Sequence, residues 1–341
     1  MSVLDVLIIG AGPAGLAAGI AAKTRGLRYL IVEKGALVNS LLHYPTDMVF
    51  FTTPELLEIG GMPFVSPYEK PTRQEALRYY RRVTDAHQLE IAFGETVTAV
   101  RRAGDGMFRA TSQPAAGEPR LRQAAAVVVA TGAYDLPNRL NVPGEDLPHV
   151  THYFLEPHPY YRRRVVIVGG KNSAAEAALV LYRAGVSVAL VHRGEGLGES
   201  IKYWVKPDIE NRIKEGSVAA RFSTHVVEIT GDHVVLEGPA GRTIEPADAV
   251  LLMTGYRSDT ALLKTAGAEI DAELGAPFHH ADTFETSVPG LFVVGACVAG
   301  SQSGRIFIEN GRFHGEVAVK TIADRLAALT DVSPGSGPPP R

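Results

Sequence analysis

The stretch VLIIGAGPAGLAAGIAAKTRGLRYLIVEK at residues 6–34 sets the expected fold. Val6 to Ile9 and Tyr29 to Val32 are short apolar runs of the kind that form buried parallel strands. The turn GAGPAG at residues 10–15 lies between them and opens a helix that should continue to about Arg25. Strand, glycine-rich turn, helix and strand in this order predict a Rossmann-like βαβ unit.

Each glycine of the turn has a steric task in such a unit. Gly10 permits the tight turn, Gly12 lets a pyrophosphate approach the backbone, and Gly15 lets the helix pack closely on the strand. The helix N-terminus offers N–H groups to phosphates. Glu33 ends the second strand, at the position where a carboxylate accepts hydrogen bonds from the ribose hydroxyls of a dinucleotide. The alternative is that Glu33 is a solvated charge at the end of the strand. The unit predicts a dinucleotide site.

A second unit of the same kind begins about 160 residues later. Arg164 to Val168 and Ser187 to Val191 are its strands, and GGKNSA at 169–174 is its turn, followed by a helix to Arg183. The small Ala174 replaces the last glycine. Lys171 replaces the middle one, and its ammonium can pair with phosphate.

The second strand of this unit ends at His192-Arg193, where sites for NAD carry an acid. An acid would repel a ribose 2′-phosphate, whereas Arg193 can bind it in bidentate fashion. NADPH is therefore favoured over NADH, with an exposed basic turn as the alternative. Lys202 is a further candidate for the same pocket.

Two such units predict an α/β chain with two Rossmann-like dinucleotide-binding domains. Apolar strands run into Ala130-Thr131-Gly132 and into Thr254-Gly255, and we expect the chain to cross between domains there. Leu291 to Val294 should return to the first sheet, and a helix from Ile306 or Phe307 to Leu326 should close that domain. FAD is favoured at the N-terminal site because a second site follows it and because Thr131-Gly132 is typical of flavoproteins.

The domain boundaries follow from these strands. We expect a discontinuous FAD-binding domain at 1–150 and 260–330, an inserted NADPH-binding domain at 151–259, and a disordered Pro/Gly/Ser-rich tail at 331–341.

Composition excludes several classes of protein. The 341 residues are 45% hydrophobic and 21% charged, with a net charge of −3, so nucleic acid is not an expected partner. No apolar run approaches the ~20 residues of a membrane helix, and no leader precedes the first strand, which favours the cytoplasm. No metal site is predicted. The single cysteine, Cys297, cannot form an internal disulfide or a Cys-x-x-Cys pair.

Four long segments resemble the bacillithiol-disulfide reductase family of thioredoxin-reductase-like flavoproteins, and the resemblance spans nearly the whole chain. They are EKGALVNSLLHYPT at 33–46, VGGKNSAAEAAL at 168–179, ESIKYWVKPDIE at 199–210 and IFIENGRFHG at 306–315. Lys171 is itself a feature of that family. The resemblance implies an NADPH-dependent flavoprotein oxidoreductase with FAD and NADPH as cofactors, assembled as a homodimer or a higher homo-oligomer.

Motif and resemblance together name the expected cofactor contacts. For FAD these are Gly10, Gly12, Pro13, Ala14, Gly15, Glu33, Lys34, Asn39, Ser40, Ala130, Thr131, Gly132, Gly295, Ala296, Arg305 and Ile306. For NADPH they are Gly169, Gly170, Lys171, Asn172, Ser173, Ala174, His192, Arg193, Lys202 and Gly255. By resemblance, Gly304 to Ile306 open the last helix beneath the flavin, and Ala296 lacks the carboxylate that related enzymes carry there.

Two departures from related enzymes bear on the substrate. The slot of the thioredoxin reductase Cys-x-x-Cys is occupied by His152 to Leu155, so the chain is not a thioredoxin reductase. Ala14 stands where many bacillithiol-disulfide reductases carry a cysteine. A disulfide would have to react directly at the flavin.

No catalytic side chain is certain. His43, His152 and His314 are candidate proton donors to a departing thiolate, with structural or surface roles as the alternative for each. Cys297 is either a small buried hydrophobe or a redox thiol near the flavin. Tyr44 and Tyr256 either pack on a cofactor ring or belong to the core.

The sequence therefore predicts an FAD-dependent NADPH oxidoreductase that acts on bacillithiol disulfide or a similar small disulfide. The first alternative is a ferredoxin or flavodoxin reductase, which needs no cysteine and would use a small acidic electron-transfer partner, docked for example at Arg162 to Arg164. The alternative from another class is a flavin-binding sensor without turnover.

Overall fold

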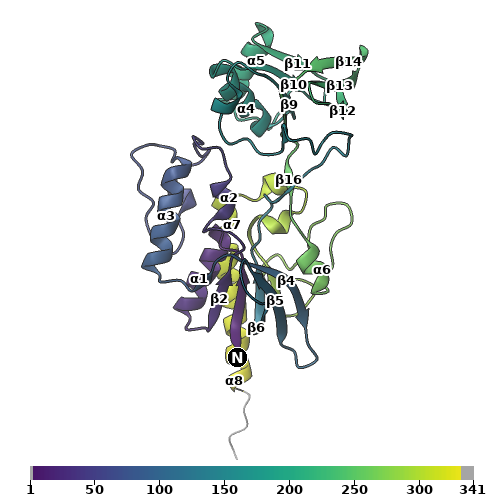
Figure 1. The fold of residues 1–341 in the computed structure, drawn as a ribbon. Coiled ribbons are helices and arrows are strands. Elements are labelled where there is room, and N and C mark those ends of the chain that lie inside the picture. The colour runs from purple at the N-terminus through teal and green to yellow at the C-terminus, as the bar shows by residue number, and fades with distance from the viewer. Residues whose placement is uncertain (1–2, 332–341) are drawn as a thin grey trace, which may run out of the picture. The chain divides into compact units, whose positions relative to one another are not determined.

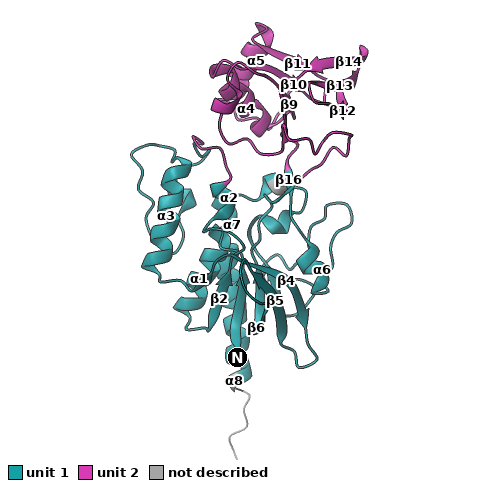
Figure 2. Cartoon of the chain, in the orientation of Figure 1, with its two compact units in different colours: residues 1–42, 49–136, 256–341 teal, residues 43–48, 137–255 magenta. Residues whose placement is uncertain are grey.

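The computed structural model describes residues 3–331 and divides the chain into two compact units, which Figure 2 shows in different colours. Unit 1 contains the residues up to 42, residues 49–136 and the residues from 256 onward, and unit 2 contains residues 43–48 and 137–255. Most of unit 2 is therefore an insertion into unit 1. The expected tail at 331–341 lies outside the described residues except for Asp331, which ends a helix.

The sheet of unit 1 has seven strands. They are β1 (Leu4–Ile9), β2 (Tyr29–Val32), β3 (Ile91–Ala92), β4 (Glu95–Arg102), β5 (Phe108–Pro114), β6 (Arg120–Val129) and β17 (Leu291–Val293). The order is β3-β2-β1-β6-β5-β4, and β17 also pairs with β6. The end of β6 runs parallel to β1 and β17, and its beginning runs antiparallel to β5. β6 thus joins the parallel part of the sheet to an antiparallel meander.

The helices of unit 1 are α1 (Pro13–Thr24), α2 (Asn39–Leu42), α3 (Arg73–Ala86), α6 (Ala261–Thr265), α7 (Ile308–Gly311) and α8 (His314–Asp331). Helix α1 packs against α8 (Figure 1). A Cβ at Gly315 would lie 2.6 Å from the carbonyl oxygen of Ala14, so the two backbones approach closely only because residue 315 is glycine. Short 3₁₀ turns complete the unit: η1 (Pro54–Leu57), η3 (Gly295–Ala299) and η4 (Ser303–Arg305).

The single last helix that the sequence predicted from Ile306 or Phe307 is wrong. Two helices, α7 and α8, occupy that stretch, and Arg305 and Ile306 precede α7 instead of opening the last helix. The break falls at Arg312, whose guanidinium donates to the carbonyl oxygens of Glu55 and Glu58 at 2.7 and 2.6 Å. This side chain ties the break to η1.

Unit 2 holds a five-stranded parallel sheet and a separate three-stranded antiparallel sheet. The parallel sheet has the order β11-β10-β9-β15-β8. Its strands are β8 (Val150–Thr151), β9 (Arg164–Val168), β10 (Ser187–Val191), β11 (Val218–Arg221) and β15 (Ala249–Leu252). The antiparallel sheet contains β12 (His225–Ile229), β13 (His233–Gly238) and β14 (Gly241–Pro246), and the helical elements are α4 (Asn172–Arg183), α5 (Lys206–Lys214) and the 3₁₀ turn η2 (His158–Tyr160).

The predicted boundaries at 150/151 and 259/260 shift to 136/137 and 255/256. The first boundary lies earlier than predicted because β8 already pairs with β15 in the parallel sheet of unit 2. A Cβ at Gly144 would lie 1.8 Å from the carbonyl oxygen of Ile229, so the segment before β8 also packs tightly within unit 2. β7 (Leu136–Pro137) and β16 (Tyr256–Arg257) pair where the chain passes from one unit to the other. None of the helices within residues 3–331 is long and apolar enough to cross a lipid bilayer.

Candidate cofactor sites

The first glycine turn is packed so tightly that two of its glycines are required by the fold itself. Gly10 has φ +107°, and a Cβ there would lie 2.5 Å from the carbonyl oxygen of Ala130. A Cβ at Gly15 would lie 2.0 Å from the carbonyl oxygen of Gly10. Both contacts are with backbone, which cannot swing away. The turn is therefore wedged between the end of β6 and helix α1.

Gly12 differs from these two glycines. A Cβ on Gly12 would meet nothing within 4 Å among the described residues, and its backbone is extended with φ −75°. Gly12 is the N-cap of α1, but no side chain in residues 3–331 caps the helix, and Pro13 follows. The fold does not need a glycine here. Open space above an uncapped helix N-terminus is suited to an anion.

Glu33 is directed at this turn. Its side chain is buried, with Oε2 accepting the Ala11 N–H and Oε1 accepting the Gly35 N–H, both at 2.8 Å. The Glu33 backbone is also held, because its N–H donates to Ala92 and its carbonyl accepts from Glu95, both at 2.9 Å. Glu33 is thus a fixed carboxylate at the end of β2 and not a solvated strand-end charge.

The neighbouring predicted residues come together at the ends of β1, β2 and β6. The Lys34 ammonium lies 2.7 Å from the Asp135 carboxylate, which joins the segment after β2 to the segment after β6. Ser40 Oγ would lie 4.0 Å from a Cβ on Gly132. Thr131 Oγ1 is buried and has no hydrogen-bond partner in the part of the chain that the structure describes. Asn39 stays local, since its Oδ1 accepts the Ala36 N–H at 3.2 Å.

Gly295 and His314 reach the same turn from the C-terminal part of the chain. Gly295 has φ +73°, and a Cβ there would lie 2.8 Å from the Ala14 Cβ. The Gly295 N–H donates to His314 Nδ1 at 3.3 Å. Ala296 follows in η3, and its carbonyl oxygen accepts from Ser258 at 3.4 Å. Arg305 is exposed in η4, and Ile306 packs on the core of unit 1.

The second glycine turn repeats the first in unit 2. Gly169 has φ +153°, and a Cβ there would lie 2.5 Å from the carbonyl oxygen of Met253, as Gly10 meets Ala130. The same Cβ would lie only 3.0 Å from the Ala174 Cβ. Because residue 169 is glycine and has no Cβ, alanine has room in place of the third glycine. Gly255 follows at the crossing with φ +87°, and its carbonyl oxygen accepts from Asn138 at 2.9 Å.

The loop after β10 folds back onto this turn. The Gly198 N–H donates to the Gly170 carbonyl at 2.8 Å, and the Lys171 side chain passes 3.4 Å from where a Gly198 Cβ would stand. The Asn172 side chain donates to the Ser200 carbonyl and accepts from the Lys202 N–H, both at 3.0 Å. This places Lys202 beside the N-terminus of α4, with Ser173 in its first turn.

Positive charge gathers at the same place. The His192 ring packs on Gly170 and Gly194, where added Cβ atoms would lie 2.4 and 2.7 Å from it. Burial lowers the pKa of His192, and the charges of Arg193 and Lys171 lower it further. The Arg193 side chain is exposed. The end of β10 therefore presents cations around a helix N-terminus.

A family model described as pyridine nucleotide-disulphide oxidoreductase matches residues 7–295, which include both turns. The chain belongs to the pyridine nucleotide-disulphide oxidoreductase family. It is 42% identical to bacilliredoxin reductase Bdr of Bacillus subtilis over 321 residues, covering 94% of this chain and 97% of the relative. The structure of bacillithiol disulfide reductase Bdr from Bacillus cereus is 41% identical with a TM-score of 0.93, and the match covers 95% and 100% of the two chains.

A more distant relative is ferredoxin–NADP reductase 1 of Bacillus licheniformis, 25% identical over 338 residues, which cover 94% of this chain and 89% of the relative. Membership of the pyridine nucleotide-disulphide oxidoreductase family makes this chain a flavoprotein oxidoreductase with FAD and NADPH as cofactors. The predicted fold class and the predicted resemblance are confirmed.

Both turns fit the cofactors of the pyridine nucleotide-disulphide oxidoreductase family. In unit 1, the open space at Gly12, the Glu33 carboxylate and the Thr131 hydroxyl, which has no partner among residues 3–331, suit the phosphates and hydroxyls of FAD. In unit 2, the cations around Arg193 suit the additional phosphate of NADPH. The residues at the two turns therefore agree with the two cofactors of the family.

The three candidate histidines lie in different surroundings. His43 is exposed in the short segment that belongs with unit 2. His152 is also in unit 2, where its Nε2 lies 3.3 Å from the Glu145 carboxylate, and burial lowers its pKa. His314 is in unit 1, and burial lowers its pKa to about 4. His152 and His314 are thus poor carriers of a proton at neutral pH.

Cys297 is buried in η3. Its Sγ donates to the carbonyl oxygens of Val294 and Val129 at 2.9 and 3.3 Å. Burial raises the pKa of the thiol to about 11. This agrees with the role of a small buried hydrophobe and not with that of a redox thiol. Tyr256 packs against Tyr134 with ring centroids 4.3 Å apart and 43° between the ring planes.

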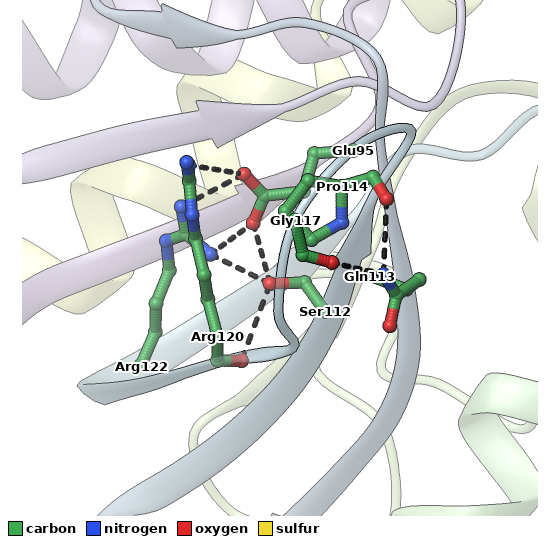
Figure 3. A network of polar contacts seen from close by, with 7 residues as sticks. All are labelled: Glu95, Ser112, Gln113, Pro114, Gly117, Arg120 and Arg122. Carbon is green, nitrogen blue, oxygen red and sulfur yellow. Dashed lines mark hydrogen bonds and ion pairs between the residues drawn. The ribbon is translucent and has the colours of Figure 1, made fainter.

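A polar cluster around the buried carboxylate of Glu95 was missed by the sequence analysis (Figure 3). The Glu95 side chain is 1% exposed and is bound by Ser112, Arg120 and Arg122. Burial alone would raise the pKa of Glu95, but the hydrogen bonds from Ser112 and Arg122 outweigh it and lower the pKa. The residues come from three strands, so no local spacing could have indicated them.

Glu176 was missed for the same kind of reason. It lies on α4, where burial raises its pKa to about 7 although Lys202 opposes this. The sequence shows only an acid on a helix, and its burial depends on packing.

Proposed function

We propose that this chain transfers hydride from NADPH, bound at the turn of unit 2, to FAD, bound at the turn of unit 1, and that it reduces bacillithiol disulfide or a closely similar disulfide. The overall reaction is NADPH, a proton and a disulfide to NADP⁺ and two thiols. The observation that carries the FAD part is Gly12, a glycine that the fold does not need, beside an uncapped helix and a fixed carboxylate. The names of the relatives support the disulfide.

The proposed FAD contacts follow the first turn and its neighbours. They are Gly10, Gly12, Pro13, Ala14, Gly15, Glu33, Lys34, Asn39, Ser40, Ala130, Thr131, Gly132, Gly295, Ala296, Arg305 and Ile306. Glu33 would hold ribose hydroxyls, and backbone N–H groups of the first turn of α1 would hold the pyrophosphate. When bound, FAD accepts hydride and passes on two electrons, so the protein's part is binding and orientation.

The proposed NADPH contacts follow the second turn. They are Gly169, Gly170, Lys171, Asn172, Ser173, Ala174, His192, Arg193, Lys202 and Gly255. Arg193 would bind the 2′-phosphate, because a planar guanidinium forms two parallel bonds to phosphate oxygens. The hydrogen bond from the Lys202 N–H to the Asn172 side chain supports Lys202 as a further cation for the other phosphates.

The chain's own residues supply no thiol for the second half of the reaction. Ala14 cannot form a mixed disulfide, and Cys297 is buried with a raised pKa. The disulfide would therefore take both electrons from the reduced cofactor, and one sulfur would leave as a thiolate. His43, which is exposed, is the proposed proton donor to that thiolate.

A ferredoxin or flavodoxin reductase is the second candidate. One specific observation favours it, since the only cysteine of the chain is buried and an electron-transfer acceptor needs no thiol. The distant ferredoxin–NADP reductase relative is of that kind.

Anaerobic reduction separates these candidates. Purified protein mixed with NADPH should lose its flavin absorption near 450 nm, and bacillithiol disulfide should restore it and release two thiols per NADPH. Restoration by ferredoxin or flavodoxin but not by the disulfide would select the second candidate. A protein that binds FAD but is not bleached by NADPH would be a flavin sensor, and both catalytic proposals would be rejected.

A cytoplasmic location and a homodimer are part of the proposal. NADPH is regenerated in the cytoplasm, which supports the location. Light scattering should give a mass near twice the 36.5 kDa of one chain, and a mass equal to one chain would contradict the dimer.

A further inference from the structure

His314 lies at the start of α8, in a stack of three rings within unit 1. Its ring centroid is 4.0 Å from that of Phe284, with 18° between the planes. Phe284 also stacks on His279, at 5.9 Å and 18°. Phe284 has φ +60°, an unusual backbone conformation for a bulky residue. Phe284 therefore contacts His314 from a left-handed backbone conformation.

One atom of His314 is already committed. Nδ1 accepts the backbone N–H of Gly295 at 3.3 Å, and a ring nitrogen that accepts cannot carry a proton. Burial, with a smaller contribution from the nearby His279, lowers the pKa of His314 to about 4. At neutral pH the single ring proton is therefore on Nε2.

The residue that His314 holds lies at a crowded place. A Cβ on Gly295 would lie 2.8 Å from the Ala14 Cβ in the first turn of α1. A Cβ on Gly311 would lie 3.3 Å from the Gly295 Cα. Gly295 is also the first residue of η3, so the orientation of its peptide group bears on how η3 begins. If the Gly295 peptide rotates, the surface that faces the first turn changes.

We propose that His314 is a positioning residue for FAD and not a proton donor: by accepting the Gly295 N–H, it fixes the Gly295–Ala296 backbone against the first turn of α1. This proposal rests on the binding of FAD at that turn, as proposed above. Its neighbour Gly315 supports the assignment, because a Cβ there would lie 2.7 Å from the Ala18 N. The start of α8 is therefore locked onto α1 on the same side.

Two substitutions separate the acceptor from the ring. His314→Phe keeps an aromatic ring on Phe284 and removes the acceptor, so the Gly295 N–H is left buried and unsatisfied. His314→Asn places an amide oxygen near the position of Nδ1 and removes the ring. His279→Phe is the matched control, since it alters the same stack without touching Gly295. Each apoprotein is titrated with FAD, and the quenching of flavin fluorescence gives the Kd.

We expect the Kd for FAD to rise about tenfold in His314→Phe, because an unsatisfied buried donor is costly. His314→Asn should recover affinity to within about threefold of the wild type, and His279→Phe should match the wild type. The opposite outcome would be a His314→Phe protein that binds FAD normally and is bleached by NADPH but no longer passes electrons to its acceptor. That would make His314 a proton donor and overturn the proposal.

Two further results decide cases that the variants alone do not. If the wild-type apoprotein takes up no FAD, the proposed function itself fails, which the titration reveals before any variant is compared. If His314→Phe does not fold, nitrogen NMR of histidine-labelled wild type decides the matter. The proposal requires a neutral His314 with its proton on Nε2 at pH 7, and a proton on Nδ1 would refute it.

Discussion

At the scale of single residues, the glycines of the first turn divide into two kinds. Gly10 and Gly15 are demanded by neighbouring backbone, with hypothetical Cβ contacts of 2.5 and 2.0 Å. A Cβ on Gly12 would meet nothing within 4 Å among the described residues, so the packing of the fold does not require glycine there, and the proposed FAD site gives it a reason. Sequence spacing identified all three, but only the structure separates the two glycines that packing requires from the one that it does not.

This division predicts different outcomes for two similar substitutions. Gly12→Ala should cost about 1 kcal/mol of unfolding free energy, since alanine is a poor N-cap, yet it should weaken FAD binding tenfold or more. Gly15→Ala should cost about 3 kcal/mol or more, because helix α1 must move off the turn. Urea unfolding of the two apoproteins and FAD titration measure both effects. Equal loss of stability in the two variants would contradict the division.

Arg193 is the residue on which we propose that the choice between NADPH and NADH depends. Arg193→Ala should raise the KM for NADPH about tenfold to a hundredfold, the effect of losing a charge-assisted bond, and leave the KM for NADH nearly unchanged. Arg242→Ala, an exposed arginine on β14, is the matched control and should alter neither. Steady-state reduction of an artificial acceptor gives both constants. A similar rise for the two nucleotides would remove the 2′-phosphate assignment.

At the scale of elements, prediction succeeded where a strand is buried on both faces. β2, β9 and β10 have the bounds that their unbroken apolar runs predicted, because parallel strands under helices need apolar side chains throughout. In the meander, the side chains of β4 and β5 alternate between more buried and more exposed positions. The sequence analysis did not identify these two strands. The break between α7 and α8 depends on Arg312 reaching η1, a long-range contact that helical periodicity does not contain.

The Glu95 cluster belongs to this scale, because it joins the three strands of the meander (Figure 3). Glu95→Gln should lower the unfolding free energy by about 3 kcal/mol, since Arg122 would lose its partner in a buried site. Asp105→Asn, in the exposed pair with Arg109 on the same meander, is the control and should change stability by less than about 1 kcal/mol. Urea unfolding at pH 7 measures both.

The pH dependence of the Glu95 effect has a definite sign. The folded pKa of Glu95 lies below its ordinary value of 4.5, so the stabilisation is fully present above that pH and is lost as the pH falls through the folded pKa. The stability difference between the wild type and Glu95→Gln should therefore be constant above about pH 5.5 and shrink below pH 4.5. A difference that grows on acidification would show that the carboxylate is not the stabilising form.

At the scale of the whole molecule, the same device is used twice. In each unit a Cβ on the first glycine of the turn would lie 2.5 Å from a carbonyl oxygen at the end of a neighbouring strand, that of Ala130 in unit 1 and that of Met253 in unit 2. One turn is followed by a buried acid at Glu33, and the other by cations at Arg193. The sequence predicted an acid after the first turn and a base after the second, on which the proposed places of FAD and NADPH rest. It could not predict where the units end, because the segment before β8 packs through backbone contacts that have no sequence signature.

The chain has one cysteine, so any path for electrons through a protein thiol must use Cys297. Its Sγ is fully buried between two carbonyl oxygens, and burial raises its pKa to about 11, so almost no thiolate exists at neutral pH. Cys297→Ala should therefore keep bleaching by NADPH and reoxidation by the acceptor within about twofold, and lower the unfolding free energy by about 1 kcal/mol through the lost packing. Stopped-flow absorbance near 450 nm and the release of thiols per NADPH measure the two half-reactions separately. A variant that is still bleached by NADPH but no longer releases thiols would place Cys297 on the electron path and require η3 to open during turnover.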